Sequence, residues 1–194
     1  YPVADFLMDL HGGDVNEKAT PFVYFPYETE EGVRDQARGG AASLSLPYRV
    51  RSSAKNGFYS WAAQCGIPAL LLERGGQGMW SEREIETYKK NVLELMAHLK
   101  MTEMKKNVPE EQEEISQSYY LEAPERGFWY PAVKEAGQII KKGELLGQLK
   151  SMDGTPLASY YAEAKGVILY YTVSLGVQAG DPLIAYGSLE SGLM

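Results

Sequence analysis

The stretch GIPALLLERGG, residues Gly66–Gly76, contains a nearly continuous apolar run from Ile67 to Glu73. A strand with this composition is typical of a sheet that is covered on both faces, because neither face alternates with polar side chains. The run ends in Glu73 and is followed by glycines. We therefore expect a carboxylate at the C-terminal edge of a sheet, where open α/β sheets hold ligands.

Strand and helix patterns alternate around this stretch. The sequence predicts two further strands, at residues 4–11 and 22–25, and three helices, at residues 30–38, 57–65 and 81–101. Gly39 and Gly40 are expected to end the first helix, and a capping box of Ser81 and Glu84 is expected to begin the third. The apolar faces of the second and third helices are predicted to comprise Phe58, Trp61, Ala62 and Cys65, and Ile85, Tyr88, Val92, Leu95, Met96 and Leu99. Such alternation predicts an α/β fold with a mixed sheet and flanking helices.

Short strands and turns replace this pattern in the last third of the chain. We predict part of an α/β catalytic domain at residues 1–102, a charged, solvated connector at 103–117 and an all-β module at 118–194. Within that module, Ile140–Leu146 matches Val177–Leu183 in the order apolar, two spacers, Gly, acid, spacer, Leu. The repeat predicts a small barrel-sandwich of the kind found in biotinyl and lipoyl carriers. Asp153 stands where those carriers have their modified lysine, so the module is expected to be a scaffold or lid.

The composition excludes several classes of protein. The chain has 194 residues, of which 44% are hydrophobic and 23% charged, and its formal net charge is -7. Nucleic acid binding requires clustered Lys and Arg and is not expected, and the apolar runs are too short to span a bilayer. The single Cys65 cannot form an intrachain disulfide, and with no secretion signal visible it favours a cytoplasmic location. Because a core strand begins within a few residues of Tyr1, we expect the C-terminal portion of a longer polypeptide.

Asp9 and His11 occupy positions i and i+2 of a predicted strand and should project from the same face. A carboxylate beside an imidazole orients the ring and raises its basicity, as it does for histidines that bind metals. A histidine that only completes a hydrogen-bond network at the strand end fits the same pattern. Partial burial of Glu73 would raise its pKa toward the range of a general base; the alternative is a surface ion pair with Arg74.

Three segments in this order resemble the succinylglutamate desuccinylase/aspartoacylase family: Asp9–Gly13, Gly66–Gly76, and Gly127–Pro131 through Tyr186–Gly187. The resemblance implies a zinc-carboxypeptidase-like fold with a C-terminal β module, and a metallohydrolase that cleaves the amide bond of an N-acyl amino acid. It assigns His11 as a zinc ligand, Glu73 as the general base that acts on zinc-bound water, and Asp9 as the partner that orients His11.

The family also holds its zinc with a His-x-x-Glu motif that should precede His11, and this chain has no such motif. Because catalytic zinc sites use three protein ligands, we expect the chain alone to bind its one divalent ion weakly or not at all and to be inactive. Arg49, Arg51 and Arg74 could bind a substrate carboxylate, although ordinary surface solvation is the simpler explanation.

Two other functions remain open from the sequence. The shared fold allows a metallocarboxypeptidase that acts on peptides, and the missing ligands allow a non-catalytic binding or assembly fragment. An incomplete sheet would also expose an unpaired edge, so we expect a homo-oligomer or pairing with a missing N-terminal half.

Overall fold

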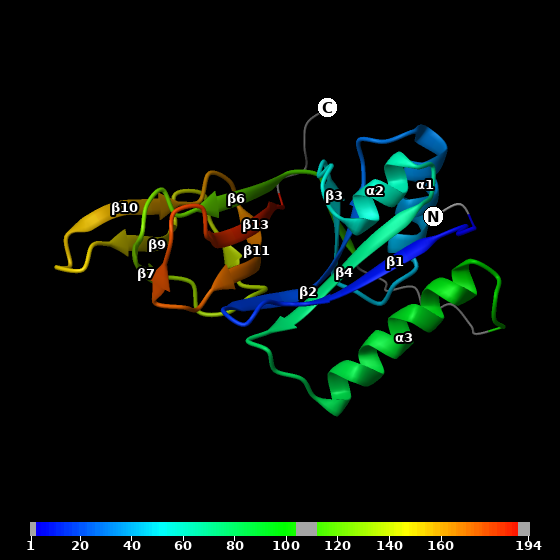
Figure 1. Ribbon diagram of the computed structural model, residues 1–194, viewed down its shortest axis with the longest axis horizontal. Helices are drawn as coiled ribbons and strands as arrows, with labels where there is room; N and C mark the ends of the chain where they lie inside the picture. Colours follow the sequence, from blue (N-terminus) through cyan, green and yellow to red (C-terminus); the bar gives the residue numbers. More distant parts are fainter. Residues whose placement is uncertain (1–2, 104–111, 190–194) are drawn as a thin grey trace. The chain divides into compact units, whose positions relative to one another are not determined.

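The computed structural model describes residues 3–103 and 112–189. The chain divides into two compact units. Unit 1 comprises Tyr1–His11, Pro21–Glu73 and Trp80–Glu114, and unit 2 comprises Gly12–Thr20, Arg74–Met79 and Ile115–Met194. The molecule is a mixed α/β structure with few helices (Figure 1).

Unit 1 contains a mixed sheet and all three helices. Its strands are β1 (Leu7–Gly12), β4 (Ala69–Gly76), β2 (Glu17–Pro26), β3 (Tyr48–Ser52) and β5 (Glu113–Ile115), in that spatial order. Its helices are α1 (Glu31–Ala42), α2 (Phe58–Gln64) and α3 (Glu82–His98). The strands β2 and β3 are parallel, with Phe22 opposite Tyr48 and Pro26 opposite Ser52. The residues before Leu7 and Ala69 that were predicted as strand are not part of β1 and β4.

The core of unit 1 forms where helices α1 and α3 meet the sheet. Ala37 and Ala41 of α1 and Leu95 of α3 belong to one buried cluster with Leu70 and Leu72 of β4. The residues Ala69–Leu72 are all buried. The prediction of a strand covered on both faces is therefore confirmed for this part of the 66–76 stretch.

Helix α1 does not end at Gly39 and Gly40, so that prediction is wrong. The helix continues to Ala42. The glycine at position 40 is explained by packing instead, because a Cβ atom there would lie 2.8 Å from the Phe6 ring and 3.2 Å from Leu95. In this helix, Gly40 permits the close approach of Phe6, which precedes β1, and of Leu95 in α3. That packing offsets the destabilisation that glycine causes inside a helix.

The predicted buried faces of α2 and α3 are also wrong in part. Phe58 and Trp61 of α2 are exposed, whereas Tyr59 and Ser60 are buried. In α3, Ser81 caps the helix as predicted, with its Oγ accepting from the Glu84 N–H at 3.3 Å. The buried residues of that helix, however, are Asn91, Glu94, Leu95 and Ala97.

Polar burial explains the change of face in α3. The Glu94 carboxylate accepts from the Ser45 backbone N–H at 2.8 Å and from Asn91 Nδ2 at 2.9 Å, and it also bonds the Ser45 hydroxyl. A buried carboxylate that has hydrogen-bond partners is tolerated in a protein interior. A search for apolar periodicity cannot detect a helix face that is anchored in this way.

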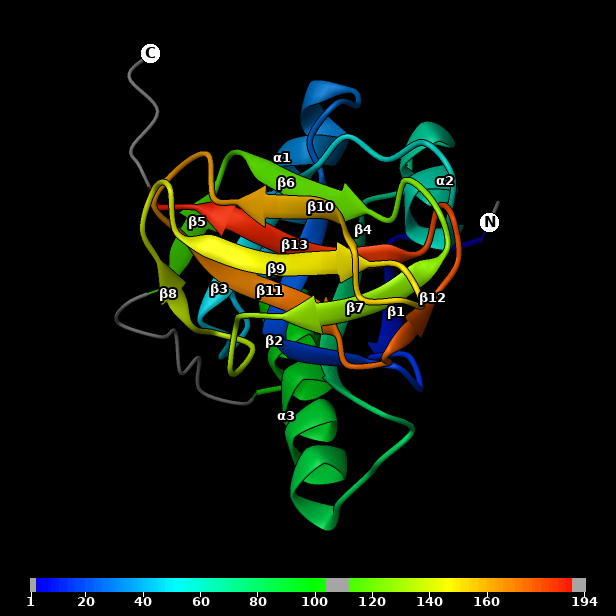
Figure 2. The same ribbon diagram turned by 90° about the vertical axis from the view of Figure 1, so that its left-hand side faces the viewer.

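Unit 2 contains two groups of antiparallel strands (Figure 2). One group has the order β11-β13-β6, with β8 and the first residues of β2 also paired to β11, and the other has the order β10-β9-β7-β12. Their bounds are β6 (Ser118–Glu122), β7 (Gly127–Pro131), β8 (Ile139–Ile140), β9 (Leu145–Lys150), β10 (Pro156–Tyr161), β11 (Gly166–Thr172), β12 (Gly176–Val177) and β13 (Pro182–Ser188). Trp129 is the largest buried side chain of this unit. Its ring packs against Gly147, where a Cβ atom would lie only 2.3 Å from the ring.

The internal repeat is confirmed in its turns. Gly143 and Gly180 both have positive φ, of 80° and 85°. The carboxylate of Glu144 accepts from the Lys141 N–H, and the carboxylate of Asp181 accepts from the Gln178 N–H in the same way. The flanking apolar residues of both copies, Ile140 and Leu146, and Val177 and Leu183, are buried. The two copies therefore build the same turn from the same residue types.

Most of the predicted connector lies outside the described residues, since 104–111 are not described. Residues after this gap are not solvated coil: Glu113–Ile115 form β5, and the Glu113 N–H bonds Pro47 O at 2.9 Å. Within residues 3–103 and 112–189, no helix has the length and apolar composition that a membrane span requires.

Candidate active site

His11 lies near the end of β1, which forms one side of the unit 1 sheet. Its imidazole is 50% exposed, and the Asp9 carboxylate, 20% exposed, has its Oδ2 at 3.4 Å from His11 Nε2. The strand itself is half-buried to exposed, not the buried strand expected from its composition. The two residues lie on one face because they are separated by two positions in a strand.

Glu73 approaches the same imidazole from β4, the strand next to β1. Its Oε1 lies 3.4 Å from His11 Nδ1, and its side chain is 17% exposed. The backbone of the two strands fixes this approach: the Leu7 N–H bonds Pro68 O near the start of both strands, and His11 and Glu73 follow at similar distances along the chain. Residues far apart in the sequence are thus brought together by strand pairing.

Helix α3 supplies a third constraint on His11. The Tyr88 hydroxyl donates to the His11 backbone oxygen, and Tyr88 itself packs against the unit 1 core. This bond holds the backbone at the end of β1. The other histidine of the chain, His98, lies beside Gly39 of α1, where a Cβ atom would be 3.5 Å from the imidazole.

The two carboxylates contact different nitrogens of one imidazole. A neutral imidazole has one N–H donor and one acceptor nitrogen, so it can donate to only one of these two carboxylates, each of which lies 3.4 Å away. In many metal-binding histidines one ring nitrogen is directed at a carboxylate. Here Asp9 lies on the Nε2 side of the ring and Glu73 on the Nδ1 side.

The donor set of these residues is incomplete for a metal ion. Among the residues that the structure describes, no group of three or more His, Cys, Asp and Glu side chains has an arrangement that could hold a metal. A single imidazole with flanking carboxylates provides one good zinc ligand, whereas catalytic zinc sites have three protein ligands. The described residues thus fit one corner of a zinc site and do not complete it.

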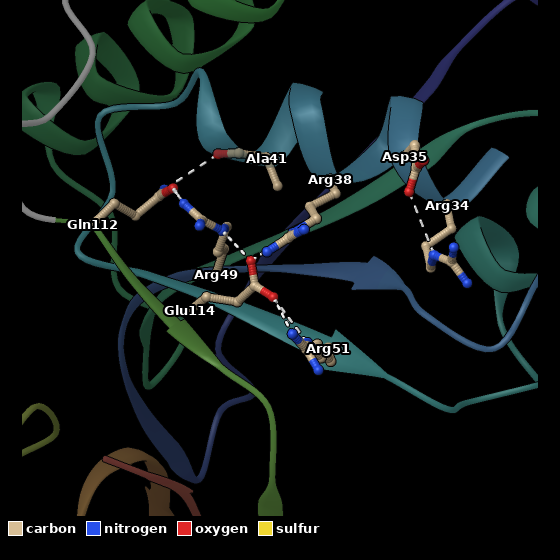
Figure 3. A network of polar contacts seen from close by, with 8 residues as sticks. All are labelled: Arg34, Asp35, Arg38, Ala41, Arg49, Arg51, Gln112 and Glu114. Atoms are coloured by element: carbon tan, nitrogen blue, oxygen red, sulfur yellow. Dashed lines mark hydrogen bonds and ion pairs between the residues drawn. The ribbon is translucent and has the colours of Figure 1, made fainter. Parts of the chain in front are cut away.

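Arg49 and Arg51, two predicted substrate ligands, lie in a different cluster of unit 1, which we call the Glu114 cluster (Figure 3). Glu114 Oε2 accepts from Arg38 Nε at 2.7 Å and from Arg49 Nε at 2.9 Å, and its Oε1 accepts from Arg51 Nε at 2.8 Å. Gln112 bonds Arg49 Nη1 at 2.7 Å. The guanidinium groups of Arg49 and Arg51 are therefore already bound to a carboxylate of the chain.

The arginines of the Glu114 cluster change the pKa of its carboxyl group. Burial would by itself raise the pKa of Glu114, but the hydrogen bonds from the three arginines outweigh burial and lower the pKa to about 2. Arg51 also stacks on the Tyr27 ring, with its Cζ 4.4 Å from the ring centroid. Glu114 was not predicted as a functional or structural site, because it falls within the predicted charged connector. No pattern in its neighbours Gln112 and Glu113 distinguishes it from the other acidic residues of that segment.

Arg74 follows Glu73 directly in β4 and is half-buried. Its backbone oxygen accepts from the Gly13 N–H at 3.0 Å. Neighbouring residues of a strand project to opposite faces, so a simple surface pair between these two side chains is not the arrangement that the strand geometry favours. Its role as a substrate ligand stays a prediction.

A further carboxyl group with an altered pKa lies in unit 2 and was not predicted. Burial, with a smaller contribution from Asp14, raises the pKa of Glu17 to about 7. Glu17 begins β2, and a Cβ atom on Gly76 would lie 1.9 Å from the Glu17 backbone oxygen. This close approach leaves no space for any side chain at Gly76 and accounts for the glycine there.

Comparisons with known proteins agree on one family. The family model described as the succinylglutamate desuccinylase/aspartoacylase catalytic domain matches residues 2–99, about half of the chain. No curated protein matches the chain by sequence.

Three solved structures have closely similar folds at low sequence identity. They are a product-bound ectoine utilization protein EutE (DoeB) from Ruegeria pomeroyi, with TM-score 0.83 and 20% identity, a succinylglutamate desuccinylase/aspartoacylase from Rhodobacter sphaeroides, with 0.81 and 21%, and a succinylglutamate desuccinylase from a Silicibacter species, with 0.80 and 20%. Each alignment covers 96–97% of this chain but only 59% of the other chain. The chain thus spans about three fifths of the length of these proteins, and from the match of the family model it belongs to the succinylglutamate desuccinylase/aspartoacylase family.

Proposed function

We propose that this chain is part of a zinc-dependent hydrolase that cleaves the amide bond of an N-acyl amino acid. The observation that carries the proposal is the 3.4 Å separation of His11 Nδ1 and Glu73 Oε1 at the ends of two neighbouring strands. Membership of the family supports the reaction class. The small-molecule acyl amino acid is the substrate, and the acyl group itself is left open.

Each of the three residues has a separate task in this proposal. Asp9 accepts a hydrogen bond from the protonated Nε2 of His11 and fixes the ring orientation. His11 then presents Nδ1 as one metal ligand. Glu73 takes a proton from water and delivers it to the leaving amine, a role that requires a carboxylate within reach of the reacting water. Bound zinc would supply a water of lowered pKa and would polarise the scissile carbonyl.

The remaining metal ligands come, in this proposal, from a part of the enzyme outside these 194 residues. The solved relatives are longer than this chain, which covers 59% of the Ruegeria pomeroyi protein. The chain by itself would then bind zinc weakly and would be inactive. Residues 1–102 would be the C-terminal part of the catalytic domain, residues 103–117 a connector, and residues 118–194 a barrel-sandwich module.

The proposal extends to location and assembly. The exposed, unpaired Cys65 and the absence of any other cysteine in the sequence are compatible with a reducing cytoplasm. Pairing with a second copy or with the missing N-terminal part would cover an open sheet edge. Size-exclusion chromatography with light scattering distinguishes pairing with a second copy from pairing with the N-terminal part. A strict monomer that does not bind the N-terminal part contradicts both kinds of pairing.

A metallocarboxypeptidase is the alternative enzyme, because metal, water and a glutamate would serve peptide hydrolysis equally well. A comparison of N-acetyl, N-succinyl and other N-acyl amino acids with short peptides, using the intact enzyme loaded with zinc, separates the two. Release of free amino acid from acyl amino acids alone supports the proposal. Cleavage of peptides alone assigns the alternative.

A non-catalytic fragment is the second alternative. It is tested by His11→Gln in the intact enzyme, with zinc content measured together with activity. We expect loss of both, because one of three ligands is removed. The control is His98→Gln, since His98 belongs to α3 and should leave zinc content unchanged. Full activity and full zinc content in His11→Gln would overturn the proposed site.

A further inference from the structure

A hollow of about 410 Å³ lies in unit 2, beside the turn that joins β9 to β10. Its size is within the range of small-molecule sites, about 300–1,000 Å³. The strands β7 and β12, which pair through Gly176 and Phe128, form another part of its wall. All of its lining residues belong to unit 2, so it is separate from the residues that the proposed hydrolysis uses.

Part of the lining of the hollow is apolar. Val177 is buried, Phe128 and Leu157 are half-buried, and Met152 is exposed. A branched or aromatic side chain of a ligand would remove apolar surface of these residues from water, which is the main source of affinity in small-molecule sites.

The lining also includes one charged side chain of each sign. Glu125 and Arg126 both line the hollow and are both exposed. The ion pairs and side-chain hydrogen bonds of residues 3–103 and 112–189 include no partner for either charged group. A carboxylate and a guanidinium that are free at the edge of one cavity are complementary to a ligand that carries both an ammonium and a carboxylate group.

The turn that joins β9 to β10 is held by its own hydrogen bonds. Asp153, at the position of the modified lysine in carrier modules, accepts from the Ser151 hydroxyl and from the Thr155 N–H. These two bonds, with Ser151 the larger contributor, lower the pKa of Asp153 to about 2. Because its carboxylate is used within the turn, Asp153 helps to keep the wall of the hollow formed before any ligand arrives, which lowers the cost of binding.

We propose that the hollow binds a free α-amino acid with an apolar side chain of about the size of leucine. Glu125 pairs with its ammonium group, Arg126 pairs with its carboxylate, and Phe128 and Leu157 contact its side chain. The module thus binds a small ligand at the end where carrier modules display a prosthetic group. The proposal does not depend on the deacylase reaction, and it is tested by binding alone.

The first experiment compares three ligands with the same side chain. L-Leucine, L-leucinamide and 4-methylpentanoate are titrated into the chain at concentrations up to ~20 mM and followed by NMR, which detects affinities in the millimolar range. We expect saturable binding of leucine, with resonances of Phe128, Leu157 and Val177 shifting, and about tenfold weaker binding of the two analogues that each lack one charge. Absence of leucine binding, or equal binding of all three, would overturn the proposal.

The second experiment changes the hollow itself. Gly176 lines the hollow, so the ring in Gly176→Phe should fill it. A Cβ atom at Gly176 would meet no heavy atom within 4 Å, so the variant should still fold. Leu175→Phe is the matched control, since Leu175 is exposed and does not line the hollow. We expect Gly176→Phe to abolish leucine binding and Leu175→Phe to retain it, with melting curves confirming that both fold.

Substitution of the charges completes the test. Arg126→Gln and Glu125→Gln should each weaken leucine binding about tenfold, while Arg126→Gln should leave the weak binding of L-leucinamide unchanged because that ligand has no carboxylate. Wild-type affinity for leucine in either variant, or in Gly176→Phe, would show that the ligand binds elsewhere and would contradict the proposed site.

Discussion

Two glutamates of unit 1 have similar exposure and very different surroundings. Glu73 is 17% exposed and lies beside one half-exposed imidazole, whereas Glu114 is 10% exposed and bonds three guanidinium groups. Guanidinium groups stay charged at all ordinary pH values, so Glu114 is fixed as an anion and has all its acceptor positions in use. Glu73 instead contacts an imidazole, whose charge, unlike that of a guanidinium group, is not permanent. The comparison teaches that the kind of partner, more than the degree of burial, distinguishes the two carboxylates.

The first prediction sharpens this comparison through activity. In the intact enzyme, Glu73→Gln should lower kcat by about 10³-fold, because general-base catalysis contributes about 10²–10⁴-fold. Zinc content should stay at the wild-type level. The measurement is steady-state hydrolysis of an N-acyl amino acid with metal analysis of the same sample, and Glu86→Gln, an exposed position on α3, is the control. A loss of less than tenfold would remove Glu73 from the role of base.

The second prediction concerns stability. Glu114→Gln should lower the free energy of unfolding by about 3 kcal/mol, because removing one partner of a buried ion pair leaves the others without compensation. Glu73→Gln should change it by less than about 1 kcal/mol, since the ion pair of Glu73 with His11 involves a half-exposed imidazole. Urea unfolding of both variants checks this. Equal losses in the two variants would break the distinction between the two carboxylates.

The third prediction ranks the arginines of the Glu114 cluster. Arg49 is 19% exposed and also bonds Gln112, whereas Arg38 is 48% exposed. Arg49→Gln should therefore destabilise the fold by about 2 kcal/mol, and Arg38→Gln by at most about 1 kcal/mol, as for exposed pairs. Thermal melting of the two variants at equal salt is sufficient. The reverse order would mean that solvent screening does not govern the cluster.

The fourth prediction follows from the lowered pKa of Glu114. The folded-state pKa of about 2 lies below the ordinary value of 4.5, so the stabilising contribution is complete above pH 4.5 and is lost as the pH falls toward 2. Wild-type protein should lose stability across this window, and Glu114→Gln should lose less. Parallel acid-unfolding curves for the two proteins would contradict the effect.

The fifth prediction concerns Glu17, whose pKa is shifted in the opposite direction. A folded-state pKa of about 7, above the ordinary 4.5, means that the folded state holds a proton which the unfolded state has released. Stability should therefore fall as the pH rises from 4.5 to about 7, and Glu17→Gln should remove that fall. Melting temperatures at pH 5 and pH 8 test it, with Lys18→Gln as the neighbouring control. An unchanged pH dependence in Glu17→Gln would be the contrary result.

Much of the fold could be read from local patterns. The apolar run of β4, the cap at Ser81 and the repeated turns at Gly143 and Gly180 depend on residues close together in the sequence, and each is present in the structure. The spacing of Asp9 and His11 likewise follows from the two-residue period of a strand. Their catalytic and metal-binding roles remain proposals.

The misassigned features have a common origin in long-range packing. Gly40 continues a helix because Phe6 and Leu95 occupy the space beside it. In α3, Glu94 is buried because its carboxylate accepts a hydrogen bond from Ser45, which lies on another segment. No local pattern contains the identity of such a neighbour, and apolar periodicity therefore assigned the wrong residues to the interior.

The sequence by itself determined which groups this protein has for chemistry, a histidine preceded by an aspartate and a glutamate at the end of an apolar strand, because backbone periodicity and composition act over a few residues. Only the tertiary structure decided which charges meet. It brought Glu73 to His11 through the pairing of β1 and β4, and it bound Arg49 and Arg51 to Glu114. The reason is physical: a charge acquires its partner, its burial and its pKa from residues that are distant along the chain and close in space.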